Sequence, residues 1–229
     1  MSGRMPITEA LGKGLYSYPE AARLTGISAR RVRDWFEAPV AGTFRHGRVL
    51  QGDYQTAGLI SFLDLIEVTV AGHMRELGIS LPSVRKARAS LEIYLHTHHP
   101  FSHRDLYTDG RKVFVHLAKA AQKDPELIEV VSQQHAIPEV LMPYLKRVDY
   151  DTVSNLARQW NIAQGVVIDP ARSFGKPIVS NCAIPTSVLA AAYRANARNA
   201  EAVAEWYSVT AEDVQAAIQF EHAYFGAAA

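Results

Sequence analysis

Cysteine is almost absent from this chain, since Cys182 is the only one among 229 residues. One cysteine cannot close an internal disulfide and cannot supply a metal site built from several thiolates. The chain is therefore expected to work in the reducing cytoplasm. No histidine stands beside Cys182 in the sequence to activate it, so we interpret it as a small buried residue rather than a catalytic nucleophile.

Long apolar runs are missing as well. No stretch approaches the roughly 20 apolar residues that a membrane-spanning helix needs, and the segment from Met1 to Glu9 lacks the basic and apolar regions of a signal peptide. Apolar residues make up 48% of the chain and charged residues 21%, the balance of an ordinary globular protein. We therefore expect no contact with a membrane. A chain of 229 residues is long enough for two or three modules.

Net charge is also small, at +1, but it is unevenly distributed. Residues 1–50 contain 8 Lys and Arg against 4 Asp and Glu, whereas residues 51–170 contain 12 against 14 and residues 171–229 contain 4 against 5. Only the first segment is basic. Because screening limits exposed charges to a range of about 10 Å, a local basic segment is what attracts a phosphate backbone.

The basic segment contains the pattern of two short helices joined by a tight turn, within residues 16–36. Pro19 suits the first turn of the first helix, and Gly26 can adopt the left-handed conformation at its end. Ser28 is a good N-cap for the second helix. The sequence therefore predicts a helix-turn-helix.

The second helix separates apolar from basic side chains. Its apolar residues recur with helical spacing and are expected to face inward; they are Val32, Trp35 and Phe36. Its basic residues are left to face outward, and they are Arg30, Arg31 and Arg33. A recognition helix needs such a face, because arginines bind phosphates and guanine edges. An ordinary surface helix with solvated arginines is the alternative interpretation.

Further elements follow with helical spacing or turn signals. Residues 43–50 are expected to form a short hairpin carrying Arg45 and Arg48. The apolar stripes of residues 59–77 and 81–95 predict two helices, the first of which is expected to share a core with the helix-turn-helix. The residues of that core are Val32, Trp35, Leu63, Ile66 and Val70.

The middle and C-terminal segments contain β and helical signals. Asp109-Gly110, flanked by residues 106–108 and 111–115, predicts a β-hairpin. Two short strands are expected at residues 145–150 and 165–168, and a helix from Asp124 to Val131. Toward the C-terminus, three helices with short links are predicted at residues 186–195, 200–206 and 210–224. The expected fold is mainly α with small β-hairpins.

Candidates for chemistry are few. His96, His98, His99 and His103 lie close together in the sequence, but a metal site needs three or four convergent ligands, so we expect a surface loop and no metal site. Scattered aspartates also suit a two-metal nuclease in principle; they are Asp149, Asp151 and Asp169. We interpret them as ordinary residues at strand ends, and we expect no enzyme and no cofactor.

Residues 26–35 resemble the helix-turn-helix of the MerR family, whose pattern is glycine, aliphatic, serine, any, arginine, any, aliphatic, arginine, any, aromatic. Residues 77–81, followed by Val84 and Arg85, resemble the step between the third and fourth helices of that family. The resemblance covers about residues 16–90 and implies a winged helix-turn-helix with residues 43–50 as the wing. The implied DNA-binding residues are Ser28, Arg30, Arg31, Arg33, Arg45 and Arg48.

The C-terminal segment resembles the module known only as domain-of-unknown-function family 433. The resemblance rests on Gly175 to Ile178, Ile184-Pro185, Ala204 to Tyr207 and Thr210 to Ala217. It implies a three-helix, helix-turn-helix-like module. The expected organisation is therefore a DNA-binding domain at residues 1–98, an α+β middle region at 99–171 and this module at 172–229.

Together the three parts resemble the long VapB-type antitoxins of VapBC toxin–antitoxin pairs. This resemblance implies a homodimer that binds its own operator DNA and neutralises a VapC toxin, a ribonuclease of the PIN fold. Basic groups able to pair with the carboxylates of such a toxin are expected in the C-terminal part. The candidates are Arg172 and Lys176, with Phe174 between them as an apolar anchor. Arg194 and Arg198 are the alternative basic groups. The alternative is a MerR-like transcription factor that acts alone and whose middle region binds a small ligand.

Overall fold

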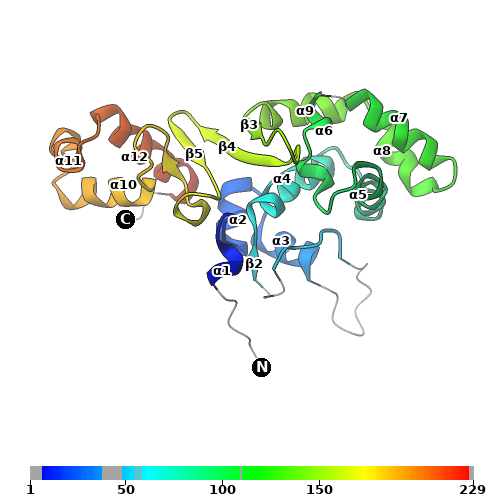
Figure 1. Ribbon diagram of the computed structural model, residues 1–229, viewed down its shortest axis with the longest axis horizontal. Helices are drawn as coiled ribbons and strands as arrows, with labels where there is room; N and C mark the ends of the chain where they lie inside the picture. The colour runs from blue at the N-terminus through cyan, green and yellow to red at the C-terminus, as the bar shows by residue number, and fades with distance from the viewer. Residues whose placement is uncertain (1–6, 38–47, 55, 57, 109, 227–229) are drawn as a thin grey trace. The chain divides into compact units, whose positions relative to one another are not determined.

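The chain is mainly helical with small antiparallel sheets, as the sequence predicts. The computed structural model describes residues 7–37, 48–54, 56, 58–108 and 110–226. It contains two compact units, the first made of residues 16–157 and the second of residues 7–15 and 158–226 (Figure 1). The three-part organisation with limits at residues 98 and 171 stays a prediction. No helix in the described part of the chain is long and apolar enough to cross a membrane.

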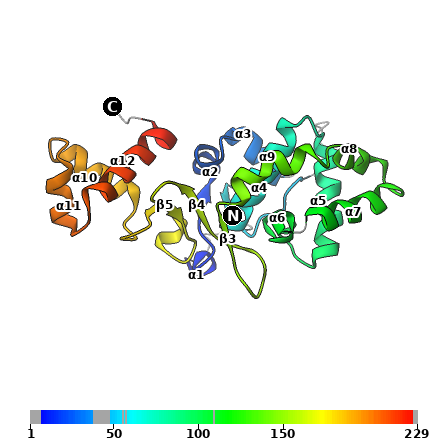
Figure 2. The ribbon, with the colours of Figure 1, turned by 90° about the horizontal axis from the view of Figure 1, so that it is seen from above.

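The first unit contains the helix-turn-helix and a group of helices that follow it. Its helices α5, α7, α8 and α9 lie together in both views of the ribbon (Figures 1 and 2). Its elements are β1 (Tyr16–Ser17), α2 (Tyr18–Thr25), α3 (Ala29–Phe36), β2 (Leu59–Ile60), α4 (Phe62–Glu76), α5 (Leu81–Leu95), η1 (Pro100–Ser102), α6 (Asp105–Thr108), α7 (Gly110–Ala121), η2 (Pro125–Leu127), α8 (Ile128–Ser132), α9 (Ala136–Leu145) and β3 (Val148–Tyr150).

Helices α2 and α3 begin and end where the sequence predicts. A capping box starts α2, in which the Ser17 hydroxyl accepts the Glu20 N–H and Glu20 Oε2 accepts the Ser17 N–H at 2.8 Å. Gly26 ends α2 with φ 76°, which an L-side chain adopts only with strain. Ser28 caps α3 by accepting the Arg31 N–H. The two predicted helices and the turn that joins them are therefore confirmed.

The core beneath these helices agrees with most of the predicted residues. Val32, Trp35, Ile66 and Val70 are all buried. Leu63 is only partly buried, because the inward face of α4 runs through its neighbours Phe62, Leu65 and Ile66 instead. Helix α4 is buried on most of its circumference, as its apolar pattern predicts.

The turn between α2 and α3 rests directly on α4 at Gly72. A Cβ atom at this position would lie 2.5 Å from Cδ1 and 2.8 Å from Cγ1 of Ile27, which is buried in the turn. Glycine is therefore required here by close approach and not by a left-handed φ. The contact fixes the position of the helix-turn-helix on the long helix.

Gly72→Ala is expected to lower the free energy of unfolding by about 1–3 kcal/mol, because overpacking forces a shift of Ile27. Ile27→Ala in the same chain should recover part of the loss, since it removes both obstructing atoms. Gly110→Ala is the matched control, because a Cβ at Gly110 meets nothing within 4 Å. Urea unfolding of the four proteins measures the effect, and equal stability of Gly72→Ala and the wild type would contradict this packing.

The predicted hairpin around Asp109-Gly110 is wrong, because this segment forms α6 and α7. Asp109 itself lies outside the described residues, and Gly110 does not adopt the positive φ that a tight hairpin turn requires. Val113 and Leu117, four residues apart, are both buried on one side of α7. Burial of this helical stripe in the tertiary structure outweighs the local turn signal.

Two other sequence predictions concern β structure. Most of the predicted wing, residues 43–47 with Arg45, lies outside the described residues, and Arg48, Val49 and Leu50 belong to no strand. The strand predicted at residues 165–168 is confirmed as β5 (Val166–Ile168), and the one at 145–150 is found as the shorter β3. The helix expected from Asp124 consists of η2 followed by α8.

The second unit packs a small antiparallel sheet against three helices. Strand β5 pairs with β4 on one side and β6 on the other. The predicted C-terminal helices are confirmed and form one group in Figures 1 and 2, drawn orange to red. Its elements are α1 (Ile7–Ala10), β4 (Ala157–Ala163), β5, η3 (Ser173–Gly175), β6 (Ile178–Val179), α10 (Thr186–Ala195), α11 (Ala200–Tyr207) and α12 (Ala211–Phe225).

A compact apolar core holds these three helices to β6. Its fully buried members come from every helix of the group, and Cys182 packs against them as a partly buried residue. Cys182 was expected to be buried, and it is only partly so. The core residues are Val179, Leu189, Val203, Ala204, Val214 and Ala217.

Candidate functional site

The candidate nucleic-acid interface is the outer face of α3. Arg30, Arg31 and Arg33 are exposed on this face, while Val32 and Trp35 anchor the opposite side in the core. The helix is amphipathic because basic and apolar residues alternate at helical spacing, so burial of one set exposes the other. This is the arrangement that a helix needs to enter a DNA groove.

Two of these arginines make long ion pairs with Asp34. Arg30 Nε lies 3.9 Å from one carboxylate oxygen of Asp34, and Arg33 Nε lies 3.8 Å from the other. The Arg30 and Arg33 side chains remain 75% and 51% exposed. Exposed pairs of this length contribute little to stability, about 0–1 kcal/mol. Breaking these ion pairs so that the arginines can bind phosphate would therefore cost little free energy.

Residues 48–50 lie beside the end of α3. The N–H groups of Val49 and Leu50 both donate to the carbonyl oxygen of Trp35, at 3.0 and 3.1 Å. This places the exposed Arg48 beside the C-terminal end of α3. Arg85 Nε, from α5, donates to the Arg48 carbonyl at 3.0 Å and fixes this backbone. Arg45 lies outside the described residues.

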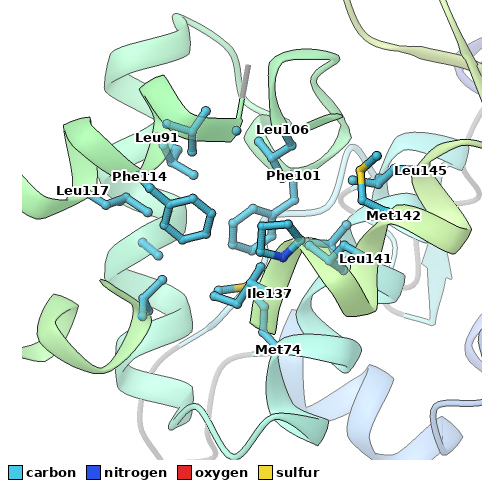
Figure 3. Close-up of a pocket in the computed structure, with 16 residues that line it drawn as sticks. Met74, Leu91, Phe101, Leu106, Phe114, Leu117, Ile137, Leu141, Met142 and Leu145 are labelled. Atoms are coloured by element: carbon cyan, nitrogen blue, oxygen red, sulfur yellow. The ribbon is translucent and has the colours of Figure 1, made fainter. Parts of the chain in front are cut away.

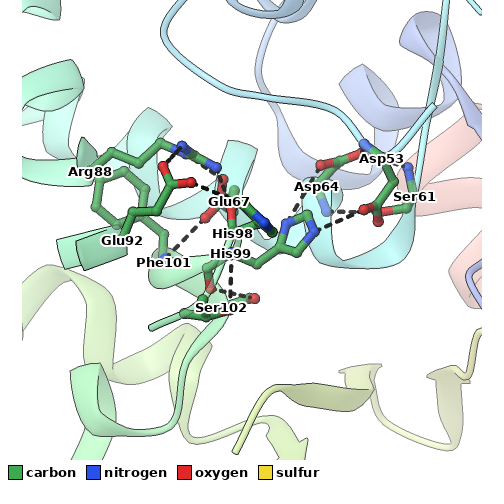
Figure 4. Close-up of polar contacts among 11 residues, drawn as sticks. Asp53, Ser61, Asp64, Glu67, Arg88, Glu92, His98, His99, Phe101 and Ser102 are labelled. Carbon is green, nitrogen blue, oxygen red and sulfur yellow. Dashed lines mark hydrogen bonds and ion pairs between the residues drawn. The ribbon is translucent and has the colours of Figure 1, made fainter. Parts of the chain in front are cut away.

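A buried polar network lies at the start of α4 (Figure 4). Glu67 is completely buried, with Oε2 2.8 Å from Arg88 Nε and Oε1 accepting the Phe101 N–H at 3.1 Å. Arg88 continues to Glu92 Oε2 at 3.0 Å and donates to the carbonyl of His98. The network thus connects α4, α5 and η1, because each of these side chains forms a hydrogen bond or ion pair with a buried group of another element.

The second half of the network centres on Asp64 and His99. Asp64 Oδ2 accepts the N–H groups of Ser61 at 2.9 Å and Asp53 at 3.1 Å, so it caps α4 and holds the loop before β2. His99 Nε2 lies 3.0 Å from Asp53 Oδ1, and His99 Nδ1 lies 3.7 Å from Asp64 Oδ1. The imidazole therefore lies between two carboxylates (Figure 4).

Burial and neighbouring charges shift the pKa values of this network. Burial raises the pKa of Asp64 to about 6 and that of Glu67 to about 7, although hydrogen bonds from Ser61 to the first and the charge of Arg88 on the second oppose the shift. Burial lowers the pKa of His99, but the hydrogen bond with Asp53 and the nearby carboxylates outweigh it and raise the pKa above its ordinary value. The network favours a bound positive charge.

The expectation of a surface loop at the histidines is wrong for two of them. His99 and His103 are buried, each 7% exposed. His98 lies at the surface and pairs with Glu92. The four histidines do not converge, and the partners of His99 are aspartates distant in the sequence. One sequence signal pointed here: Asp64 and Glu67 fall within a helix that is apolar on most sides, so both acids needed buried partners.

Among the residues that the structure describes, no group of three metal-ligating side chains includes the other acidic candidates. Asp149 and Asp151 belong to the first unit and Asp169 to the second. Asp151 accepts the N–H groups of Val153 and Ser154 in a tight turn, and Asp169 pairs with Arg172 at 3.2 Å. Within the described ranges, the only three-residue group of metal-ligating side chains is Asp53, Asp64 and His99.

An apolar pocket lies between helices of the first unit (Figure 3). The side chains of Phe101 and Phe114 meet in it, and Met74 and Met142 line its wall. None of its lining residues carries a charge. Such a pocket suits an apolar ligand, because its side chains offer no charged group to offset the cost of burying a polar ligand.

The predicted toxin-binding residues are all exposed on the second unit. Phe174 is 44% exposed in the loop between Arg172 and Lys176. Arg194 lies in the last turn of α10, and Arg198 in the link to α11. An exposed aromatic pair on α11 was not anticipated from the sequence: Trp206 is 68% and Tyr207 37% exposed.

The C-terminal residues 166–220 match a family described as "Protein of unknown function (DUF433)". The match overlaps the segment for which the sequence predicts this module. Along nearly the whole chain, the sequence is also 26% identical to a Mycobacterium tuberculosis protein named "Putative antitoxin VapB45", covering 95% of this chain and 98% of that protein. The chain is a distant homologue of that protein.

The fold has a counterpart among solved structures. The X-ray crystal structure of Rv2018 from Mycobacterium tuberculosis matches with a TM-score of 0.67 over 91% of this chain and 98% of that one. The two sequences are 22% identical in this alignment, so the likeness concerns the fold. The fold of this chain is thus one that another protein also adopts.

Proposed function

We propose that this protein is an antitoxin that neutralises a PIN-type ribonuclease toxin and binds its own operator DNA. The observation that carries the proposal is the similarity to the mycobacterial protein named as an antitoxin, which extends over 95% of this chain. A shared module alone would not support it, but a match along both units does. The proposal includes no catalytic activity of the protein itself.

The DNA-binding half of the proposal is supported by α3. Three exposed arginines follow the N-cap Ser28 on one helical face, and the core beneath the helix holds that face in place. Arg48 adds a fourth positive charge beside it, and Arg45 is assigned to the same interface from the sequence. Two-fold operators are bound by dimers, so we propose that two copies of the chain bind together.

The toxin-binding half is supported by the loop around η3. Ser173 and Phe174 adopt φ values of 46° and 55°, which non-glycine residues rarely do. Backbone bonds hold this conformation, because Leu15 N–H donates to the Phe174 carbonyl at 3.0 Å and Gly175 N–H to that of Arg172 at 2.8 Å. A held loop that exposes an aromatic ring between two cations suits a carboxylate-rich active site.

Co-expression with the neighbouring gene, which the proposal expects to encode a PIN-type toxin, tests the proposal. The wild type should co-purify with the toxin and restore growth. Arg172→Ala, Phe174→Ala and Lys176→Ala together should lower toxin affinity at least 10-fold and abolish rescue, because hot-spot aromatics and arginines carry about 2 kcal/mol or more each. Operator binding should be unchanged in this variant.

The comparison variant combines Arg194→Ala with Arg198→Ala, the alternative basic surface. Loss of rescue in this pair, with full rescue by the triple variant, would move the toxin contact to the link after α10. Growth rescue and co-purification by both folded variants would contradict a neutralising role of the second unit.

A second candidate function is favoured by the apolar pocket of the first unit, namely a transcription factor that acts without a toxin and responds to a small apolar ligand. In that case no toxin co-purifies, and an apolar compound such as indole changes operator affinity. Leu106→Trp, which fills the pocket, would then remove the response. The same co-expression experiment therefore separates the two functions.

A further inference from the structure

Two buried polar atoms face each other in the first unit. Asp64 Oδ1 and His99 Nδ1 lie 3.7 Å apart, and neither makes a hydrogen bond within the part of the chain that the structure describes. Asp64 is fully buried and His99 is 7% exposed. Because the carboxylates of Asp53 and Asp64 are acceptors, a cation or a proton has to lie between Asp64 and His99.

The hydrogen bond on the other side of the ring determines which nitrogen is available. When His99 Nε2–H donates to Asp53 Oδ1 at 3.0 Å, Nδ1 keeps its lone pair and points it at Asp64. Carboxylates commonly orient metal-binding imidazoles in this way, with one ring nitrogen held and the other on the ion. The Asp53 side chain is 23% exposed, so water can reach this edge of the group.

The surrounding charge also favours a cation. Four carboxylates belong to the network of Figure 4, those of Asp53, Asp64, Glu67 and Glu92, and Arg88 is the guanidinium that pairs with two of them. With neutral imidazoles, the network has three negative charges in excess. Buried carboxylates in such an excess bind either protons or a metal ion.

We propose that Asp64 and His99 bind a divalent transition-metal ion such as Zn²⁺, with Asp53 holding the imidazole through Nε2. One ligand atom from each of the three residues lies within 4.8 Å of the others. Ligands of a tetrahedral zinc ion, each about 2.1 Å from the metal, lie roughly 3.4 Å apart, close to the separation of Asp64 Oδ1 and His99 Nδ1. An imidazole ligand beside a carboxylate suits Zn²⁺ or Mn²⁺ better than Ca²⁺, which prefers oxygen ligands alone.

The ion would join three segments that are distant in the sequence. Asp53 lies in the loop before β2, Asp64 in the first turn of α4, and His99 directly before η1. The same loop contacts α3, since a Cβ at Gly52 would lie 3.2 Å from Cδ1 of Phe36. A bound ion would therefore fix the loop beside α3 to the helices that follow.

The test uses the full-length, untagged protein after removal of metal with EDTA. Titration with ZnCl₂ against a chromogenic chelator should show one equivalent bound, and the melting temperature should rise by about 5–10 °C at an ion concentration of 100 times Kd. His99→Gln and Asp64→Asn should lose this equivalent. Asp53→Asn should bind about 10–100-fold more weakly, as expected for a group that orients the ligand.

His98→Gln is the matched control, because His98 is adjacent in sequence but 86% exposed and paired with Glu92. It should keep the zinc equivalent and the rise in melting temperature. Should Asp64→Asn fail to fold by circular dichroism, His99→Gln decides. The absence of saturable binding by the wild type, or unchanged binding by folded His99→Gln, would overturn the proposal and leave a shared proton between Asp64 and His99.

Discussion

Replacing Arg30 and Arg31 by alanine is expected to lower operator affinity by about 30-fold or more, because each guanidinium that binds a base edge or phosphate contributes about 1–3 kcal/mol. Both side chains are exposed and make no buried contact, so the variant should fold with unchanged stability. Its binding should also depend less on salt, since each lost phosphate contact reduces the slope of log K against log salt by about 0.9. Gel-shift titration at several salt concentrations measures both effects.

The matched control for this variant is Arg111→Ala with Lys112→Ala. These residues form an exposed basic pair in α7, so the change in net charge is the same. Operator affinity and salt dependence should stay close to those of the wild type. Equal losses in both double variants would show that net charge alone determines binding, and α3 would lose its role as the recognition helix.

Trp35→Ala is expected to destabilise the protein by about 3–5 kcal/mol, since truncation of a buried aromatic leaves a cavity. Trp35 is 3% exposed and its carbonyl accepts two N–H groups from residues 49 and 50. The melting temperature should fall by roughly 10 °C or more. Operator binding should be lost with it, because the core under α3 holds the arginine face in place.

Trp206→Ala provides the control, because this tryptophan is 68% exposed on α11. A surface substitution of this kind should change the free energy of unfolding by no more than about 0.5 kcal/mol. Differential scanning calorimetry of the three proteins gives the comparison. Loss of DNA binding by Trp35→Ala at full stability would mean that Trp35 contacts DNA and that the face of α3 is assigned incorrectly.

Short-range chemistry made the helix-turn-helix and the C-terminal helices predictable from the sequence. Ser28 and Thr210 are caps whose side chains accept N–H groups three residues ahead, and Gly26 ends α2 in the left-handed conformation. Such interactions involve neighbours only, so they act in the same way in any surroundings. The exposed face of α3 followed from them, since apolar residues at helical spacing leave the arginines outside.

Residues 106–115 show where local chemistry was insufficient. Asp-Gly between β-branched residues is a strong hairpin signal, but Val113 and Leu117 are buried together only when the segment is a helix. The gain from burial depends on what surrounds the segment, and that is absent from its own sequence. The Asp-Gly preference for a turn therefore contributes less free energy than the burial of the apolar side of α7.

By itself the sequence determined the caps, the periodic faces and the number of C-terminal helices, because each depends on residues within one or two turns. Only the tertiary structure decided that Asp53, Asp64 and His99 meet, although 46 residues separate the first from the last. Their approach depends on how α4, α5 and η1 pack, and that packing is the sum of many weak contacts between distant segments. No local pattern carries that information, so His99 could not be distinguished from its exposed neighbour His98 before the fold was known.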